Sequence, residues 1–116
     1  LSLLLLFKKK VNINIAIINN GYLGMVRQWQ ELFYDSRFAE TPISSPDYIK
    51  IAEAYGLEGY RVHNRREIEN TIRKAKSNPG PVIIEFVVEK HDVVYPMVPT
   101  GAALNAMINR PEKEEA

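Results

Sequence analysis

The residues best suited to chemistry lie in the stretch Asn19-Asn20-Gly21-Tyr22-Leu23-Gly24, directly after an apolar run. An asparagine side-chain oxygen and a backbone carbonyl two residues later can face the same hard cation. Mg²⁺ prefers such oxygen ligands, with phosphate oxygens completing its shell. A helix that begins after the turn offers free N–H groups to phosphates. The pattern therefore indicates a site for a divalent cation and a phosphate group.

The same stretch is also typical of structures without chemistry. Asn-Gly between apolar segments often marks a two-residue β-hairpin, and asparagine is a common helix cap. A hairpin is excluded because the residues that follow do not alternate and instead show apolar side chains at helical spacing, namely Met25, Trp29, Leu32 and Phe33. A turn without a ligand stays open, because one asparagine is not enough to hold a metal and the chain has no Asp-rich partner.

No other side chains form a catalytic pattern, and no residue is assigned a catalytic role. His63 and His91 lie far apart without the spacing of metal ligands, so surface or loop roles are favoured. Met97 and Met107 are better explained by packing than by a soft-metal site. The absence of cysteine excludes a disulfide framework, a thiolate metal site and a cysteine nucleophile.

The composition is that of one soluble globular domain. The chain has 116 residues, of which 46% are apolar and 25% charged. A net charge of +1 gives no long-range attraction to nucleic acid or to an anionic membrane. The apolar run at residues 1–7 is far shorter than the ~20 residues of a membrane helix and lacks the charge order of a signal peptide. We therefore expect neither a nucleic-acid nor a membrane partner, and interpret residues 1–10 as the end of a helix that begins upstream.

The turn must be positioned by a sheet. Two apolar runs rich in β-branched residues predict strands at residues 11–18 and 82–88, and the far end of the first strand is expected to be buried on both faces. A shorter extended piece is expected between them at residues 59–62. Strands that alternate with helices imply parallel pairing with right-handed crossovers. The expected fold class is therefore α/β, a three-layer α/β/α arrangement with a parallel sheet. Ligands of such sheets bind beyond the carboxyl ends of the strands, where the turn lies.

Start and stop signals predict the helices between these strands. One helix follows the Asn-Gly turn, and two more are expected over residues 45–55 and 64–75. Ser45 is expected to cap the second of these helices. Asn64 and Glu67 resemble a capping box at the start of the third.

Residues 19–34, Asn-Asn-Gly-Tyr-Leu-Gly-Met-Val-Arg-Gln-Trp-Gln-Glu-Leu-Phe-Tyr, closely resemble the thiamine-diphosphate-binding domain of the large, catalytic subunit of acetolactate synthase. Residues 46–56 and 94–104 resemble it too. The likeness implies that residues 1–108 are the C-terminal part of this domain and that residues 109–116 are a solvated tail. In the family the metal motif is Gly-Asp-Gly followed later by Asn-Asn, and only its second half is present here. The Leu-rich start departs from the family, which tends to have small and polar residues there.

The resemblance implies roles for neighbouring residues of the turn. Asn20 would give its side-chain oxygen to Mg²⁺, and Tyr22 would give its backbone carbonyl. Gly21, Leu23 and Gly24 would let the backbone approach the diphosphate of the cofactor.

The resemblance also implies a substrate region beyond the turn. Met25 would lie against the cofactor and substrate pocket. Trp29 would line the entrance that selects the second 2-oxoacid and that accommodates sulfonylurea- and imidazolinone-type inhibitors. Residues 95–104 would form an arm that folds over the site.

The activity implied by the resemblance is the condensation of pyruvate with pyruvate or 2-oxobutyrate, with loss of CO₂, in branched-chain amino-acid biosynthesis. It requires thiamine diphosphate and Mg²⁺. The FAD site and the catalytic glutamate of the family belong to other domains, so the isolated chain is expected to be inactive. The complete enzyme would be a homo-oligomer with a regulatory subunit, in the cytoplasm or, in a eukaryote, in a plastid.

Two alternatives stay open. The first is another thiamine-diphosphate-dependent decarboxylase, carboligase or oxidase, against which the tryptophan in Gln-Trp-Gln argues. The second is a non-catalytic α/β remnant that binds no cofactor and acts as an association module.

Overall fold

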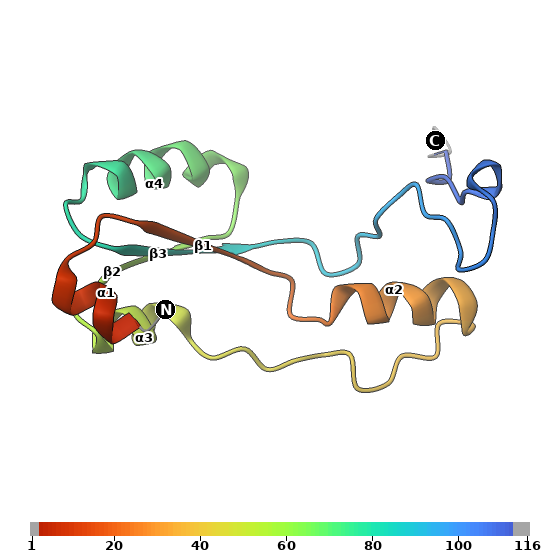
Figure 1. The fold of residues 1–116 in the computed structure, drawn as a ribbon, viewed down its shortest axis with the longest axis horizontal. Coiled ribbons are helices and arrows are strands. Elements are labelled where there is room, and N and C mark those ends of the chain that lie inside the picture. Colours follow the sequence, from red (N-terminus) through yellow and green to blue (C-terminus); the bar gives the residue numbers. More distant parts are fainter. Residues whose placement is uncertain (1–2, 113–116) are drawn as a thin grey trace.

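Three strands pair in parallel to form the sheet of the computed structural model, which describes residues 3–112 (Figure 1). The strands are β1 (Asn14–Asn19), β2 (Glu58–Val62) and β3 (Val82–Val87). Their order is β1-β3-β2, so the last strand in the chain lies in the middle of the sheet. The predicted strands and their parallel pairing are confirmed.

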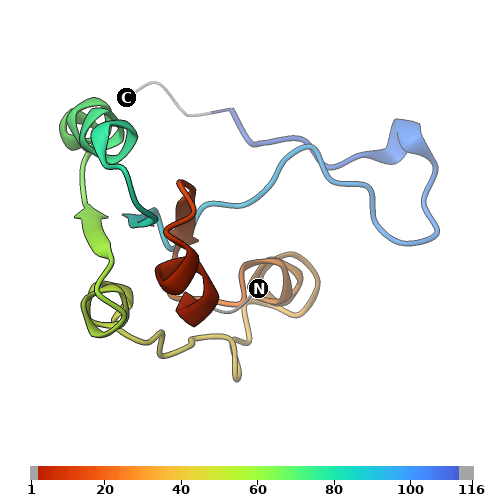
Figure 2. The same cartoon turned by 60° about the vertical axis from the view of Figure 1, so that its left-hand side comes forward.

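Helices cover both faces of this sheet. In Figures 1 and 2, α4 (Arg65–Ser77) lies on one face, whereas α1 (Leu3–Lys9) and α3 (Tyr48–Ala54) lie on the other. The expected three-layer arrangement is therefore present. A short 3-10 helix, η1 (Leu104–Ala106), lies in the segment that follows the sheet.

The alternation of side chains along β3 builds two small cores. Residues on the α4 side form one cluster, which consists of Val62, Ala75, Val82 and Ile84. Residues on the α3 side form the other, which consists of Ala52, Leu57 and Ile83. Because successive side chains of a strand point to opposite faces, the central strand contributes to both clusters.

The predicted burial of the first strand is wrong. β1 begins at Asn14 rather than at residue 11, and its side chains alternate in exposure up to Ile18, which is 67% exposed. Ile18 is exposed because β1 is an edge strand and α4, the helix on that face of the sheet, packs against β2 at the opposite edge. The outer side of Ile18 has no covering helix among residues 3–112.

Helix capping corrects a second prediction. Asp47, not Ser45, caps α3, because its carboxylate accepts the backbone N–H groups of Ile49 and Lys50 at 3.1 and 3.2 Å. Asp47 is the cap because α3 begins at Tyr48, two residues later than a helix capped by Ser45 would begin.

The predicted cap at Asn64 is confirmed. Its side chain accepts the N–H of Arg66 at 3.1 Å. The Glu67 carboxylate accepts the N–H of His63 at 3.1 Å, one residue before the cap, so the capping box is extended by one residue. This contact is the main cause that lowers the pKa of Glu67.

One helix stands away from the layers. α2 (Gly24–Phe33) projects beyond the carboxyl end of β1 (Figure 1), and the segment after β3 contacts it through His91, Val94 and Met97. The radius of gyration is consequently 18.5 Å, against about 13 Å for a compact domain of this length. The expectations about residues 1–2 and about residues 113–116 of the tail lie outside the described residues. Within the described part, no helix is long and apolar enough to cross a membrane.

The contact between α3 and β2 generates a test of the fold. A Cβ added at Gly59 would lie 3.0 Å from the Cβ of Ala52, which is fully buried. Gly59→Ala should therefore displace α3 and lower the free energy of unfolding by about 1–2 kcal/mol. Gly80→Ala is the matched control, since its added Cβ would meet only Asn78 Oδ1 at 3.5 Å. Denaturant titration that finds both variants equally stable would contradict the packing of α3 on the sheet.

Candidate functional site

The Asn-Asn-Gly stretch leaves β1 as two successive side-chain turns. Asn19 Oδ1 accepts the N–H of Gly21 at 3.0 Å, and Asn20 Oδ1 accepts the N–H of Tyr22 at 3.1 Å. Gly21 has φ +73°, a conformation that strongly favours glycine. These contacts fix the path of the chain between β1 and α2, because asparagine side chains replace the backbone as acceptors.

Residues 41–43 make two backbone hydrogen bonds to the turn. The N–H of Leu23 donates to the carbonyl of Thr41 at 2.8 Å, and the N–H of Ile43 donates to the carbonyl of Gly21 at 3.0 Å. Thr41 is fully buried. The backbone N–H of Leu23 is thus already paired, so the N–H groups left for a ligand begin with α2 itself.

The start of α2 has the features of an anion site. The cap residue is Leu23, which makes no capping hydrogen bond with its side chain. The first N–H groups of a helix have no partner within the helix, and the helix dipole attracts negative charge to them. Gly24 lets the Asn20 amide lie close to the helix start, since a Cβ there would lie 3.1 Å from Asn20 Nδ2.

The same turn offers oxygen ligands to a hard cation. Asn20 Oδ1 uses one lone pair on Tyr22 and keeps a second, and the carbonyl of Tyr22 follows two residues later. Among the residues described, no three His, Cys, Asp or Glu side chains gather to hold a metal. The donor set therefore fits Mg²⁺ in part, with two oxygens that need phosphate or other oxygens to complete the shell.

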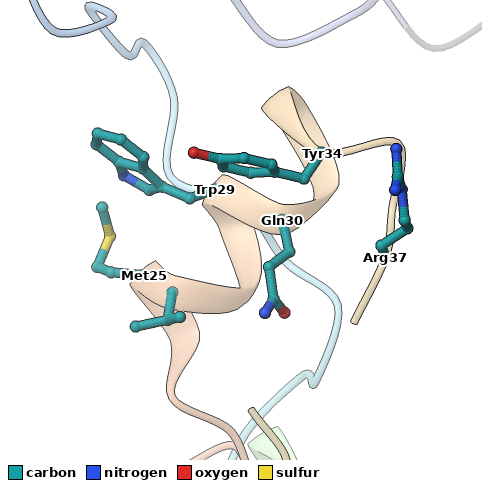
Figure 3. Close-up of a pocket in the computed structure, with 6 residues that line it drawn as sticks. Met25, Trp29, Gln30, Tyr34 and Arg37 are labelled. Carbon is teal, nitrogen blue, oxygen red and sulfur yellow. The ribbon is translucent and has the colours of Figure 1, made fainter. Parts of the chain in front are cut away.

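Met25 and Trp29 form the groove that follows the turn along α2. Both side chains project from the same side of the helix, as their spacing predicts (Figure 3). The groove has a volume of about 630 Å³, and Trp29 is 38% exposed in it while its ring packs edge-on against Phe33. The residues that line it are Met25, Val26, Trp29, Gln30, Tyr34 and Arg37. Trp29 is thus a groove residue and not part of either core cluster.

The buried side of α2 carries two polar residues that sequence reasoning missed. Gln28 Oε1 accepts the N–H of Val94 at 2.9 Å, and Gln28 Nε2 donates to the carbonyl of Val94 at 3.1 Å. The same Nε2 lies 3.1 Å from Met97 Sδ. Arg27 forms an ion pair with Glu31 at 2.9 Å. Gln28 therefore ties Val94 and Met97, in the chain after β3, to α2. Residues 95–104 do not line the groove. No signal in the sequence marked Gln28 as buried.

The histidines lie in loops. His91 is exposed, and its Nδ1 lies 2.9 Å from Arg27 Nη2. Because a guanidinium only donates, Nδ1 is the acceptor in this contact. His63 is exposed just before α4. Neither ring lines the groove of Met25 and Trp29.

A buried carboxylate lies behind the turn. Glu85 is in the middle of β3, and its side chain is 5% exposed. It accepts a hydrogen bond from Asn19 Nδ2 at 2.7 Å and another from Arg61 Nε at 2.6 Å. Arg61 also donates to the capping carboxylate of Asp47 at 2.9 Å. The available signal was a single acidic residue in an otherwise apolar strand, Val-Ile-Ile-Glu-Phe-Val-Val.

The electrostatics of Glu85 follow from these partners. Burial by itself raises the pKa of its carboxyl group, but the hydrogen bonds from Arg61 and Asn19 outweigh it and lower the pKa below its usual value. Glu85 is therefore ionised at neutral pH and acts only as an acceptor.

Comparisons with known proteins agree on one family. The sequence model described as "Thiamine pyrophosphate enzyme, C-terminal TPP binding domain" matches residues 2–86. The acetolactate synthase catalytic subunit, mitochondrial, of Saccharomyces cerevisiae is 45% identical over 97 residues, which cover 84% of this chain and 14% of that protein. The acetolactate synthase of Mycobacterium leprae is 43% identical over 97 residues, which cover 78% of this chain and 16% of that protein.

A third relative extends the range of organisms. The acetolactate synthase large subunit of Cyanidium caldarium is 38% identical over 101 residues, which cover 85% of this chain and 17% of that protein. The chain thus spans between 14% and 17% of the length of these three relatives.

The groove position of Trp29 predicts a small effect on stability. Trp29→Leu should change the free energy of unfolding by about 1 kcal/mol or less, because the indole is exposed on one side. Val82→Ala is the comparison variant in the core, where the side chain is fully buried, and it should cost about 2–3 kcal/mol. Thermal or denaturant unfolding of both variants measures the difference. A loss at Trp29 as large as that at Val82 would make Trp29 a core residue.

Proposed function

Because this chain belongs to the thiamine pyrophosphate enzymes, as part of their C-terminal TPP-binding domain, we propose that it works within an acetolactate synthase catalytic subunit. The observation that carries the proposal is the turn at residues 19–24, where Asn20 Oδ1 keeps one lone pair beyond its bond from Tyr22 and the Tyr22 carbonyl precedes a helix start without a side-chain cap. The identity of 38–45% to three acetolactate synthases from different organisms supports it.

The turn would hold the charged end of the cofactor. Asn20 Oδ1 and the carbonyl of Tyr22 would bind Mg²⁺, and the first N–H groups of α2 would bind the diphosphate. Gly21 and Gly24 would leave room for the backbone to approach it, since neither carries a side chain. Bound thiamine diphosphate supplies the electron sink of the reaction. Mg²⁺ would anchor the diphosphate in this arrangement.

The groove on α2 would receive the substrates. Met25 lies in the first turn of α2 and Trp29 one turn further along, so a molecule at the Met25 end of the groove would be close to a group bound at the helix start. The groove is lined largely by apolar side chains, which suits the alkyl group of a 2-oxoacid such as pyruvate or 2-oxobutyrate. Trp29 would select between the two as the second substrate, and it would also contact inhibitors of the sulfonylurea and imidazolinone types.

The remaining parts of the proposal concern partners. The name of the Saccharomyces cerevisiae relative contains the words "catalytic subunit", which supports an enzyme with more than one subunit. The complete enzyme would be a homo-oligomer with a regulatory subunit. FAD would bind outside this chain. We place the protein in the cytoplasm, or in a plastid if the organism is a eukaryote, although the names of some relatives include a mitochondrial location.

The proposed activity is tested in the full-length protein. With pyruvate, thiamine diphosphate and Mg²⁺, the protein should release CO₂ and form acetolactate. Asn20→Ala should weaken Mg²⁺-dependent binding of thiamine diphosphate at least about 10-fold, because a metal ligand is lost. Asn12→Ala, in the exposed segment before β1, is the control and should bind like the wild type. Binding without product would favour another enzyme of the family, and the absence of both would favour a non-catalytic association module.

The proposed role of Trp29 has its own test. Trp29→Leu in the full-length protein should alter the ratio of products formed from pyruvate alone and from pyruvate with 2-oxobutyrate. It should also weaken the binding of sulfonylurea-type inhibitors, because a large aromatic face is lost. Competition between the two substrates measures the ratio. An unchanged ratio with unchanged inhibitor binding would remove Trp29 from the site.

A further inference from the structure

Asn19, the residue before the proposed magnesium ligand Asn20, contacts a side chain of the central strand. Asn19 pairs with Val87 in the parallel register, while Ile17 pairs with Glu85. Residues two apart on a strand share a face, so Asn19 and Glu85 point to the same side of the sheet. Arg61 pairs with Glu85 on the other side of β3 and shares that face as well. The register therefore brings the three side chains together at the carboxyl end of the strands.

The hydrogen bonds of Asn19 can be satisfied in one orientation only. Its Nδ2 faces Glu85 Oε1 at 2.7 Å, and its Oδ1 faces the N–H of Gly21 at 3.0 Å. An ionised carboxylate only accepts and a backbone N–H only donates, so exchanging the two ends of the amide would break both contacts. Glu85 thus determines which end of Asn19 faces the turn.

Glu85 is itself held on its other oxygen. Arg61 Nε donates to Oε2 at 2.6 Å, and Arg61 Nη2 donates to Asp47 at the start of α3. A buried ion pair contributes little net stability over apolar residues that replace both partners. A solely stabilising role of Glu85 and Arg61 could therefore be filled by two apolar side chains, whereas orienting Asn19 requires an acceptor at this place.

We propose that Glu85 is a positioning residue for the cofactor turn, which acts through Asn19 to hold Asn20 and Tyr22 where their oxygens can bind Mg²⁺. This inference rests on the proposed function, since it assumes that the turn holds the metal. Glu85 touches neither metal nor substrate, and its effect passes through the Asn19 amide and the N–H of Gly21.

Reversal of the hydrogen-bond polarity tests the proposal. Glu85→Gln leaves one acceptor for two donors, because the glutamine oxygen can serve Arg61 while its NH₂ group faces Asn19 Nδ2. Adding Asn19→Asp restores the pattern, since one oxygen of the new carboxylate accepts from the glutamine and the other from Gly21. The double variant keeps the net charge of the wild type. Asn19→Asp alone sets two carboxylates against each other and should also weaken binding.

The measurement is calorimetric titration of Mg²⁺ into the full-length protein with excess thiamine diphosphate, beside thermal unfolding. Glu85→Gln should weaken Mg²⁺ binding about 10- to 100-fold, as loss of an outer-shell partner typically does. The double variant should recover most of this loss. Glu69→Gln is the matched control, because it removes an exposed ion pair with Arg73 on α4 and should bind like the wild type.

The outcomes separate this inference from the proposed function. If the wild type shows no Mg²⁺-dependent cofactor binding, the proposed function fails and the inference fails with it. If the wild type binds and Glu85→Gln binds equally well, only the positioning role is overturned. If Glu85→Gln does not fold, the double variant decides. Restored folding with restored binding supports the role, whereas restored folding without binding, or no folding, contradicts it.

Discussion

A buried negative charge in the middle of the sheet is the constraint on which the site depends. Glu85 lies on the central strand and is satisfied by one donor from each neighbouring strand, Asn19 of β1 and Arg61 of β2. Because the three strands are parallel and in register, these side chains meet toward the carboxyl ends of the strands. The sheet thereby determines the orientation of the residue from which the turn begins, and the turn determines where α2 starts.

α2 is held by side chains and loops rather than by a hydrophobic core. Residues 41–43 bind the turn before it, and Gln28 binds the chain that leaves β3. Its other side carries the open groove of Met25 and Trp29. A helix with so little apolar burial of its own can present both its start and one face to ligands. This arrangement agrees with a cofactor domain whose chemistry lies at the edge of the sheet.

Much of this structure could be predicted from the sequence, because hydrophobic periodicity reports which faces are buried. It identified the first and third strands and the shared face of Met25 and Trp29, and together with capping signals it identified the helices. It failed at Ile18, since apolar type alone cannot tell an edge strand from a central one. It failed at Ser45, because two possible caps stood two residues apart. The partners of Glu85 and Gln28 could not be predicted, because they depend on strand order and on contacts between residues 66 positions apart. The roles of Asn20, Tyr22 and Trp29 toward ligands stay predictions.

We infer that the turn after β1 binds the metal and the diphosphate of thiamine diphosphate. A crystal structure of the full-length protein with Mg²⁺ and thiamine diphosphate tests it most directly. We expect Asn20 Oδ1 and the carbonyl oxygen of Tyr22 to lie about 2.1 Å from Mg²⁺, with the diphosphate at the first N–H groups of α2. A metal and diphosphate bound away from this turn, with Asn20 Oδ1 still engaged only by the N–H of Tyr22, would contradict it.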